Sequence, residues 1–193
     1  MVRLSLVRHG RAAAGWDTAI DPPLDEEGRR QAATTAENLA AEIRVATNDI
    51  EVVTSPLLRC RETADAFVSI IGRAARVETR IAEIPSPPGI AVADRVTWLR
   101  RVMQGTWSDL VAREGSLYGD FRSELIAWAR TVRVDTVAFS HFVAINAVIG
   151  AAIGDDRLVI RSLDNASVTT LNVDATGTLT LLEGGSEADT LIR

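Results

Sequence analysis

The chain has 193 residues, of which 47% are hydrophobic and 24% are charged, values typical of an ordinary soluble globular protein with one full core. Its formal net charge of −5 argues against nucleic acid as a partner. No apolar run is long enough to span a bilayer, so we expect a cytoplasmic protein without a membrane partner.

The basic residues and the cysteine exclude several kinds of site. All 21 basic residues are arginine, which excludes Schiff-base catalysis and P-loop phosphate binding, because both need a lysine. The single cysteine, Cys60, excludes an internal disulfide and a cysteine zinc cluster. With only two histidines and no paired-aspartate arrangement, a metal site has poor prospects, and we expect no metal and no cofactor.

Short β-branched runs alternate with longer helical segments along the chain. Strands are expected at residues 3–7, 51–54, 76–79, 134–139, 158–162, 167–173 and 178–182, and helices at 26–44, 56–71, 93–103, 118–131 and 142–152. This alternation predicts an α/β fold, a three-layer α/β/α sandwich whose mainly parallel sheet is covered on both faces.

One proline-rich segment interrupts this pattern. It runs from Glu83 to Gly89 and contains Pro85, Pro87 and Pro88. With the helix that follows, it is expected to form a small helical cap insertion, at about residues 84–118, over one edge of the sheet. We expect residues 1–185 to form a single domain and residues 186–193 to form a loosely held acidic tail.

The first segment that carries chemistry is Leu6-Val7-Arg8-His9-Gly10. An expected strand ends here, and the Arg-His-Gly triplet lies on the turn that follows it. Side chains at this point face the crevice beyond the carboxyl ends of the strands, where open α/β folds bind their ligands.

The second segment runs from Ser55 to Ala64 and also follows a strand. Ser55 is expected to cap the helix, with Pro56 at its first position. Arg59 then lies in the first turn and leans back toward the same crevice. The free N–H groups and the dipole of this helix would favour an anion there.

The third segment is Ser140-His141-Phe142, again between a strand and a helix. Arg8, Arg59 and the only two histidines of the chain are therefore expected at one edge of the sheet.

Six segments, in this order, resemble the histidine phosphatase superfamily, also called the phosphoglycerate mutase-like fold. They are Leu-Val-Arg-His-Gly at 6–10, Pro-Leu-Asp-Glu-Glu-Gly-Arg-Arg-Gln-Ala at 23–32, Ser-Pro-Leu-x-Arg-Cys-x-x-Thr-Ala at 55–64, Glu83, Ser-His at 140–141, and Asn-Ala-Ser at 165–167. A single Arg-His-Gly triplet would be weak evidence, but six ordered segments cover most of the chain.

The resemblance implies a role for each residue of the site. His9 would be the nucleophile, kept neutral by the charges of Arg8 and Arg59, which would bind the phosphate oxygens. His141, protonated or donating a proton, would complete the pocket. Glu83 would be the general acid and then the general base. Other carboxylates, Asp17, Glu62 and Asp94, compete with Glu83 for that role.

Two departures from the family pattern concern phosphate binding. Many members carry an asparagine several residues after the nucleophile, where this chain has Gly15-Trp16-Asp17. The glycines that often follow the second histidine are replaced by Phe142 and Val143. Both departures bear on how closely the backbone can approach a phosphate.

The function expected from this resemblance is a metal-independent phosphatase that acts on a small phosphomonoester or a phosphoprotein through a phosphohistidine on His9. A phosphoglycerate mutase is an alternative, but the Glu-Arg pair that mutases carry is missing before Tyr118-Gly119. A short phosphohistidine phosphatase is a closer alternative, but those enzymes tend to lack a sizeable cap, whereas this chain is expected to have one. A non-catalytic phospho-ligand binding module of the same fold is the alternative from another functional class. Nothing in the sequence indicates the oligomeric state.

Overall fold

Six strands form one mixed sheet, in the order β3-β2-β4-β1-β5-β6, in the computed structural model, which describes residues 1–46 and 50–188. The strands are β1 (Val2–Arg8), β2 (Ile50–Thr54), β3 (Arg76–Val77), β4 (Asp135–Ser140), β5 (Val168–Val173) and β6 (Leu179–Glu183). The first four strands are mutually parallel, whereas β5 runs antiparallel to β1 and β6 antiparallel to β5. The sheet is therefore mainly parallel, as the sequence predicted, with an antiparallel hairpin at one edge.

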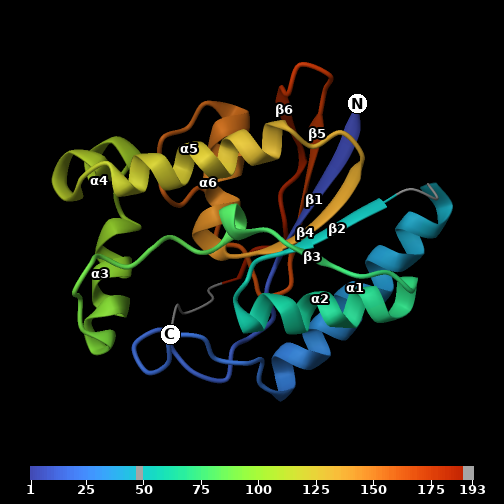
Figure 1. Ribbon diagram of the computed structural model, residues 1–193, viewed down its shortest axis with the longest axis horizontal. Coiled ribbons are helices and arrows are strands. Elements are labelled where there is room, and N and C mark those ends of the chain that lie inside the picture. The colour runs from blue at the N-terminus through green and yellow to red at the C-terminus, as the bar shows by residue number, and fades with distance from the viewer. Residues whose placement is uncertain (47–49, 189–193) are drawn as a thin grey trace.

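Helices cover both faces of the sheet (Figure 1). They are α1 (Glu26–Ala46), α2 (Leu58–Ile71), α3 (Arg95–Val102), α4 (Trp107–Glu114), α5 (Leu117–Arg130) and α6 (Phe142–Ile153), with 3-10 turns at Thr79–Ile81 and Val92–Asp94. Helices α1 and α2 lie together on one face, and α5 and α6 lie on the other (Figure 1). The three-layer α/β/α sandwich expected from the sequence is confirmed.

The alternation of side chains along the central strands creates a separate core on each face of the sheet. Leu4 and Leu6 of β1 pack with α5, α6 and the cap. Val7 of β1 and Phe139 of β4 pack instead against α1 and α2. Because both faces of the sheet are buried, the carboxyl ends of the parallel strands remain as the place where polar side chains can gather.

One predicted strand was wrong. Residues 158–162 form no strand but an irregular loop. The fully buried Asn146 of α6 holds it: its side-chain oxygen accepts hydrogen bonds from the backbone N–H groups of Ile160 and Arg161, and its NH₂ group donates to the carbonyls of Phe142 and Arg161. One amide side chain thus replaces the ladder partners that a strand would have needed.

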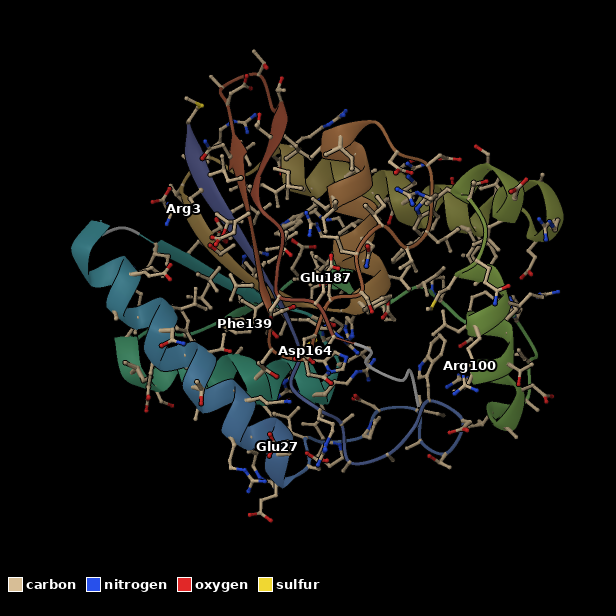
Figure 2. The ribbon with its side chains drawn as sticks, turned by 180° about the vertical axis from the view of Figure 1, so that it is seen from behind. Arg3, Glu27, Arg100, Phe139, Asp164 and Glu187 are labelled. Atoms are coloured by element: carbon tan, nitrogen blue, oxygen red, sulfur yellow. The ribbon has the colours of Figure 1, made fainter. Side chains whose placement is uncertain are left out.

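The cap contains a helix that the sequence analysis missed. Helix α4 has Thr106 as its N-cap, whose hydroxyl accepts a hydrogen bond from the Asp109 N–H, and it buries Trp107 and Leu110. Helices α3 and α4 project to one side of the sheet (Figure 1). Figure 2 shows Arg100 on this outlying part of the molecule.

The start of α2 also differs from the prediction, since the helix begins at Leu58, with Leu57 and not Ser55 as its N-cap. The hydroxyl of Ser55 accepts only a 3.3 Å bond from the Leu57 N–H, and its other partner lies in the site described below.

The described part of the expected acidic tail, residues 186–188, pairs with the segment before Asn165. Leu163 and Glu187 form an antiparallel bridge, Asp164 N donates to Ser186 O, and Arg161 pairs with Glu187 at 2.9 Å. Figure 2 shows Asp164 and Glu187 at this junction. The remaining tail residues, 189–193, lie outside the described residues, and the division into domain and tail stays a prediction. No helix in the described part of the chain has the length and apolarity to cross a membrane.

Candidate active site

The turn that carries His9 is held by backbone bonds from both neighbouring strands. His9 N donates to Ser140 O at 3.0 Å, at the end of β4, and Arg8 N donates to Ser167 O at 3.0 Å. The His9 carbonyl accepts bonds from Ala166 N and from Asn165 Nδ2, each at 3.2 Å. Ala166 adopts a left-handed conformation, with φ 56°, to make this turn. The Asn-Ala-Ser segment noted in the sequence therefore holds the backbone of His9.

Two glycines let helix α1 approach this turn. A Cβ atom on Gly28 would lie 2.1 Å from Arg11 O, and one on Gly10 would lie 2.4 Å from Gly28 O. Helix α2 is tied to the same turn by Thr63, whose hydroxyl accepts a bond from Gly10 N at 3.1 Å and donates to Arg59 O at 2.6 Å. Thr63 thus links the turn to Arg59.

The guanidinium of Arg59 lies between the two imidazoles. Its Nε donates to His9 Nε2 at 3.2 Å, and its NH2 lies 3.2 Å from His141 Nδ1. The two rings meet edge to face, with centroids 5.3 Å apart. Arg59 NH1 is buried and makes no hydrogen bond to any described residue. One guanidinium therefore contacts both imidazoles and keeps a nitrogen that makes no hydrogen bond to a described residue.

His9 presents a neutral imidazole whose Nε2 lone pair accepts the hydrogen bond from Arg59. Its Nδ1 lies 2.7 Å from Gly10 O, a carbonyl that can only accept, so the proton is on Nδ1. The pKa of His9 lies well below its ordinary value of 6.5, because burial and then the positive charges of Arg59 and Arg8 disfavour the imidazolium. The Nε2 atom is therefore unprotonated at physiological pH, the state that a nucleophile requires.

His141 is fully buried, and of the two states expected from the sequence, protonated or donating a proton, its surroundings disfavour the first. Burial and then the charge of Arg59 lower its pKa well below 6.5, so the ring is neutral in the free protein. Its Nε2 lies 2.7 Å from Ser55 Oγ. Sequence reasoning had read Ser55 as a helix cap and missed this contact, which only the packing of β2 against β4 creates.

Arg8 is 5% exposed and lies beside the same pocket. Its NH1 donates to Leu163 O, and its guanidinium lies over the ring of Phe142, 5.0 Å from the centroid. Burial is the main cause that lowers the pKa of Arg8 to about 10, which leaves it charged at neutral pH. Its Nε makes no hydrogen bond to a described residue, so it remains a free donor. Phe142, one of the departures from the family pattern, thus supports a phosphate-binding candidate.

Glu83 lies at the edge of the pocket and is partly exposed. One carboxylate oxygen accepts a bond from Ile84 N at 3.0 Å, and the other lies 3.5 Å from Val143 N, at the start of α6. Burial raises the pKa of Glu83 above 4.5, against the opposing charges of Arg59 and Arg8. A raised pKa favours a carboxyl group that can donate a proton.

The competing carboxylates are placed differently. Asp17 and Asp94 are exposed, and Glu62 accepts a 2.6 Å hydrogen bond from Leu24 N. Arg8 and Arg59, which lower the pKa of both histidines, also act on the pKa of Glu83. Glu83 is therefore the carboxylate that the fold brings to the pocket.

Asp21 was not identified from the sequence. Its Oδ1 accepts a 2.7 Å bond from Leu58 N at the start of α2 and lies 3.8 Å from Arg59 NH1. The expectation that the N-terminus of this helix is free for an anion was therefore wrong for its first N–H group, which the carboxylate of Asp21 occupies. Within the described residues, no three histidine, cysteine or acidic side chains are grouped to hold a metal ion.

Comparisons with known proteins place this geometry in a family. A model of the histidine phosphatase superfamily (branch 1) matches residues 4–183. The fold is similar to that of a mycobacterial glucosyl-3-phosphoglycerate phosphatase, with a TM-score of 0.70 and 21% identity over 97% of this chain and 100% of that one. For a putative alpha-ribazole-5′-P phosphatase from Escherichia coli the values are 0.71 and 18% over 98% of both chains. For YhfR of Bacillus stearothermophilus they are 0.70 and 21% over 94% and 95%. No curated protein sequence matches the chain.

Proposed function

Because the chain belongs to the histidine phosphatase superfamily (branch 1), we propose that it hydrolyses a phosphomonoester through a phosphohistidine formed on His9. The observation that carries the proposal is the pair of contacts that Arg59 makes with His9 Nε2 and His141 Nδ1. A cation held between two neutral imidazoles, each with a lone pair facing it, is suited to bind a phosphoryl group that His9 can then attack.

Substrate binding exchanges these contacts for contacts with phosphate. The phosphoryl oxygens take the N–H donors of Arg59 and the Nε–H of Arg8, and each of these two arginines has a buried nitrogen that makes no hydrogen bond to a described residue. His9 Nε2 then loses its hydrogen bond from Arg59 and faces the phosphorus atom. Two guanidinium groups in a buried site supply the positive charge that phosphoryl transfer requires, so the proposed reaction uses no metal.

In the first chemical step, the lone pair of His9 Nε2 forms a bond to phosphorus as the ester P–O bond breaks. The leaving oxygen takes both electrons of that bond and a proton from Glu83, whose raised pKa favours the protonated acid. The Nδ1–H bond to Gly10 O fixes the ring during the attack and stabilises the positive charge that develops on it.

In the second step, water attacks the phosphohistidine. Glu83, now a carboxylate, takes a proton from the water as its oxygen bonds to phosphorus. The P–N bond breaks and returns its electron pair to His9 Nε2, which regenerates the neutral ring. The products are inorganic phosphate and the alcohol of the ester.

Two observations support a small-molecule ester as the substrate. The names of two similar structures refer to phosphatases of small phosphorylated compounds. The catalytic histidines are also almost completely buried, with His9 8% and His141 0% exposed, which favours a narrow substrate over a folded phosphoprotein surface.

The test is hydrolysis of an aryl phosphate and a panel of small phosphomonoesters in EDTA. We expect phosphate release that survives chelation and disappears in His9→Ala, with the variant retaining the thermal stability of the wild type. Rapid acid-free quenching of the wild type with labelled substrate should trap phosphate on His9 alone. Labelled protein in His9→Ala, activity lost on chelation, or transfer to a second alcohol without phosphate release would each contradict the proposal.

A further inference from the structure

Two side chains, one just before α2 and one within it, contact the Nε2 atom of His141, the ring nitrogen that does not face Arg59. Ser55 Oγ lies 2.7 Å from it and Cys60 Sγ lies 3.3 Å from it. Both side chains are fully buried, as is His141. The proposed reaction assigns a role to neither of them.

The protons on His141 can be counted from its partners. A guanidinium only donates hydrogen bonds, so the Nδ1 atom that lies 3.2 Å from Arg59 NH2 must accept one. A neutral imidazole that accepts at Nδ1 carries its hydrogen on Nε2. That N–H needs an acceptor, because a buried donor without a partner is costly.

Ser55 is the better acceptor of the two neighbours. Its oxygen lies at the distance of a strong hydrogen bond, and it also accepts from Leu57 N at 3.3 Å, which uses its second lone pair. The thiol of Cys60 points its hydrogen elsewhere, since Sγ donates to Ser140 O at 3.3 Å, and sulfur is a weak acceptor. Burial raises the pKa of Cys60, so it stays a thiol.

We propose that Ser55 is a positioning residue, whose hydroxyl holds the Nε2–H of His141 and so leaves Nδ1 as the nitrogen that meets the phosphoryl group. This inference rests on the proposed function and deepens it. When a phosphoryl oxygen of a phosphate monoanion displaces Arg59 from Nδ1, the ring can take the P–O–H proton at Nδ1 and hydrogen-bond the resulting P–O⁻ oxygen without rotating. The charged and titratable groups around the ring are Arg59 and Cys60 from α2, and Arg8 and His9 from the end of β1.

The first test is the tautomer itself, read by ¹⁵N NMR of protein labelled at histidine. Only two histidines are present, so the spectrum of His9→Ala assigns the signals of His141. In the free protein we expect a protonated Nε2 and an unprotonated Nδ1. With orthovanadate bound, we expect both nitrogens to be protonated. A free protein that carries its proton on Nδ1 would overturn the inference, and this readout does not depend on turnover.

The second test compares Ser55→Ala with Cys60→Ala, which removes the other contact to the same nitrogen. We expect kcat/KM to fall about 10- to 100-fold in Ser55→Ala, mainly through kcat, and to change less than about threefold in Cys60→Ala. Ser55→Thr, which restores a hydroxyl, should recover most of the loss. Thermal unfolding of each variant separates a loss of fold from a loss of positioning.

A double-mutant cycle distinguishes positioning from general disruption. If Ser55 acts through His141, Ser55→Ala should cause no further loss in a His141→Ala background. This inference alone would be overturned if Ser55→Ala lowered kcat/KM by the same factor in both backgrounds. It would also be overturned if Ser55→Ala kept the full kcat/KM of an active wild type. A wild type that releases phosphate from no phosphomonoester would overturn the proposed function, and with it the role given to Ser55.

Discussion

The Nε–H of Arg59 points at Nε2 of His9 from 3.2 Å, so in the resting protein the nucleophilic lone pair is already occupied by the group that is proposed to bind substrate. The same guanidinium reaches His141 and belongs to the first turn of α2. Arg59 therefore orients both imidazoles, and its charge adds to burial in keeping them neutral. Its contacts are exchanged for contacts with phosphate when substrate binds.

Arg59 is expected to be irreplaceable by lysine. Arg59→Ala should lower kcat/KM about 10³-fold or more, because the guanidinium no longer stabilises the negative charge of the transition state. Arg59→Lys should recover little of it, since one ammonium group cannot contact both imidazoles and a phosphate in the planar geometry of a guanidinium. Arg61→Ala, an exposed arginine two residues further along α2, is the matched control and should be close to wild type. Steady-state kinetics tests this prediction, and a near-normal kcat/KM in Arg59→Lys would contradict the role given to the guanidinium geometry.

The role of Glu83 depends on the leaving group. Glu83→Gln should slow hydrolysis of an alkyl phosphate roughly a hundredfold, because an alkoxide needs a proton as it leaves. With p-nitrophenyl phosphate the loss should be smaller, since nitrophenolate leaves without one. Asp94→Asn serves as the carboxylate control, and orthovanadate affinity should be unchanged in both variants. An equal loss on both substrates would remove Glu83 as the general acid.

The pH profile follows from the two pKa shifts. His9 is active when neutral, and because its pKa is lowered, kcat/KM should show no rise through pH 6.5. Glu83 is active as the protonated acid, and because its pKa is raised above 4.5, activity should fall as pH increases through that raised value. Maximal activity is therefore expected at pH values below the raised pKa of Glu83. Because wild type and Glu83→Gln are measured on the same substrate, the ratio of their pH profiles removes the contribution of the substrate's own titration. A falling limb that survives in Glu83→Gln would assign it to another group.

The approach of α1 to the nucleophile turn predicts a strong effect from one methyl group. Gly28→Ala places a Cβ 2.1 Å from the backbone of Arg11 and should lower the free energy of unfolding by about 1–3 kcal/mol, or more if the turn cannot shift. Activity should fall with it, because the turn includes His9 and Gly10. Gly105→Ala is the control, since its Cβ would meet nothing closer than 3.5 Å. Urea unfolding and kinetics of both variants provide the comparison, and a Gly28→Ala protein of wild-type stability would refute the close approach.

Much of this arrangement could be predicted from local sequence. The alternation of strands and helices indicated the sandwich, and each of the three Arg- and His-containing segments follows a strand that ends at the same edge. The sequence could not indicate that residues 158–162 avoid a strand, because the cause is a side chain on another element: Asn146 satisfies the backbone of that segment through three hydrogen bonds.

The contacts within the pocket were also beyond the reach of the sequence. Ser55 has the residue type of a helix cap, and nothing in its neighbours along the chain indicates that its hydroxyl meets an imidazole 86 residues away. The neutral state of His141 follows from complete burial beside Arg59, which depends on how β2, β4 and α2 pack. Composition and spacing identify such residues, but tertiary packing determines their protonation.

The place of β1 in the sheet has a consequence for how the protein is made. This strand lies between β4 and β5, so the hydrogen bonds that hold the His9 turn come from Ser140 on one side and from Asn165 to Ser167 on the other. A ribosome synthesises His9 before Asn165, and that histidine cannot reach its working position until the 156 residues from one to the other have emerged. A product truncated before Asn165 would therefore carry the proposed nucleophile without its backbone support.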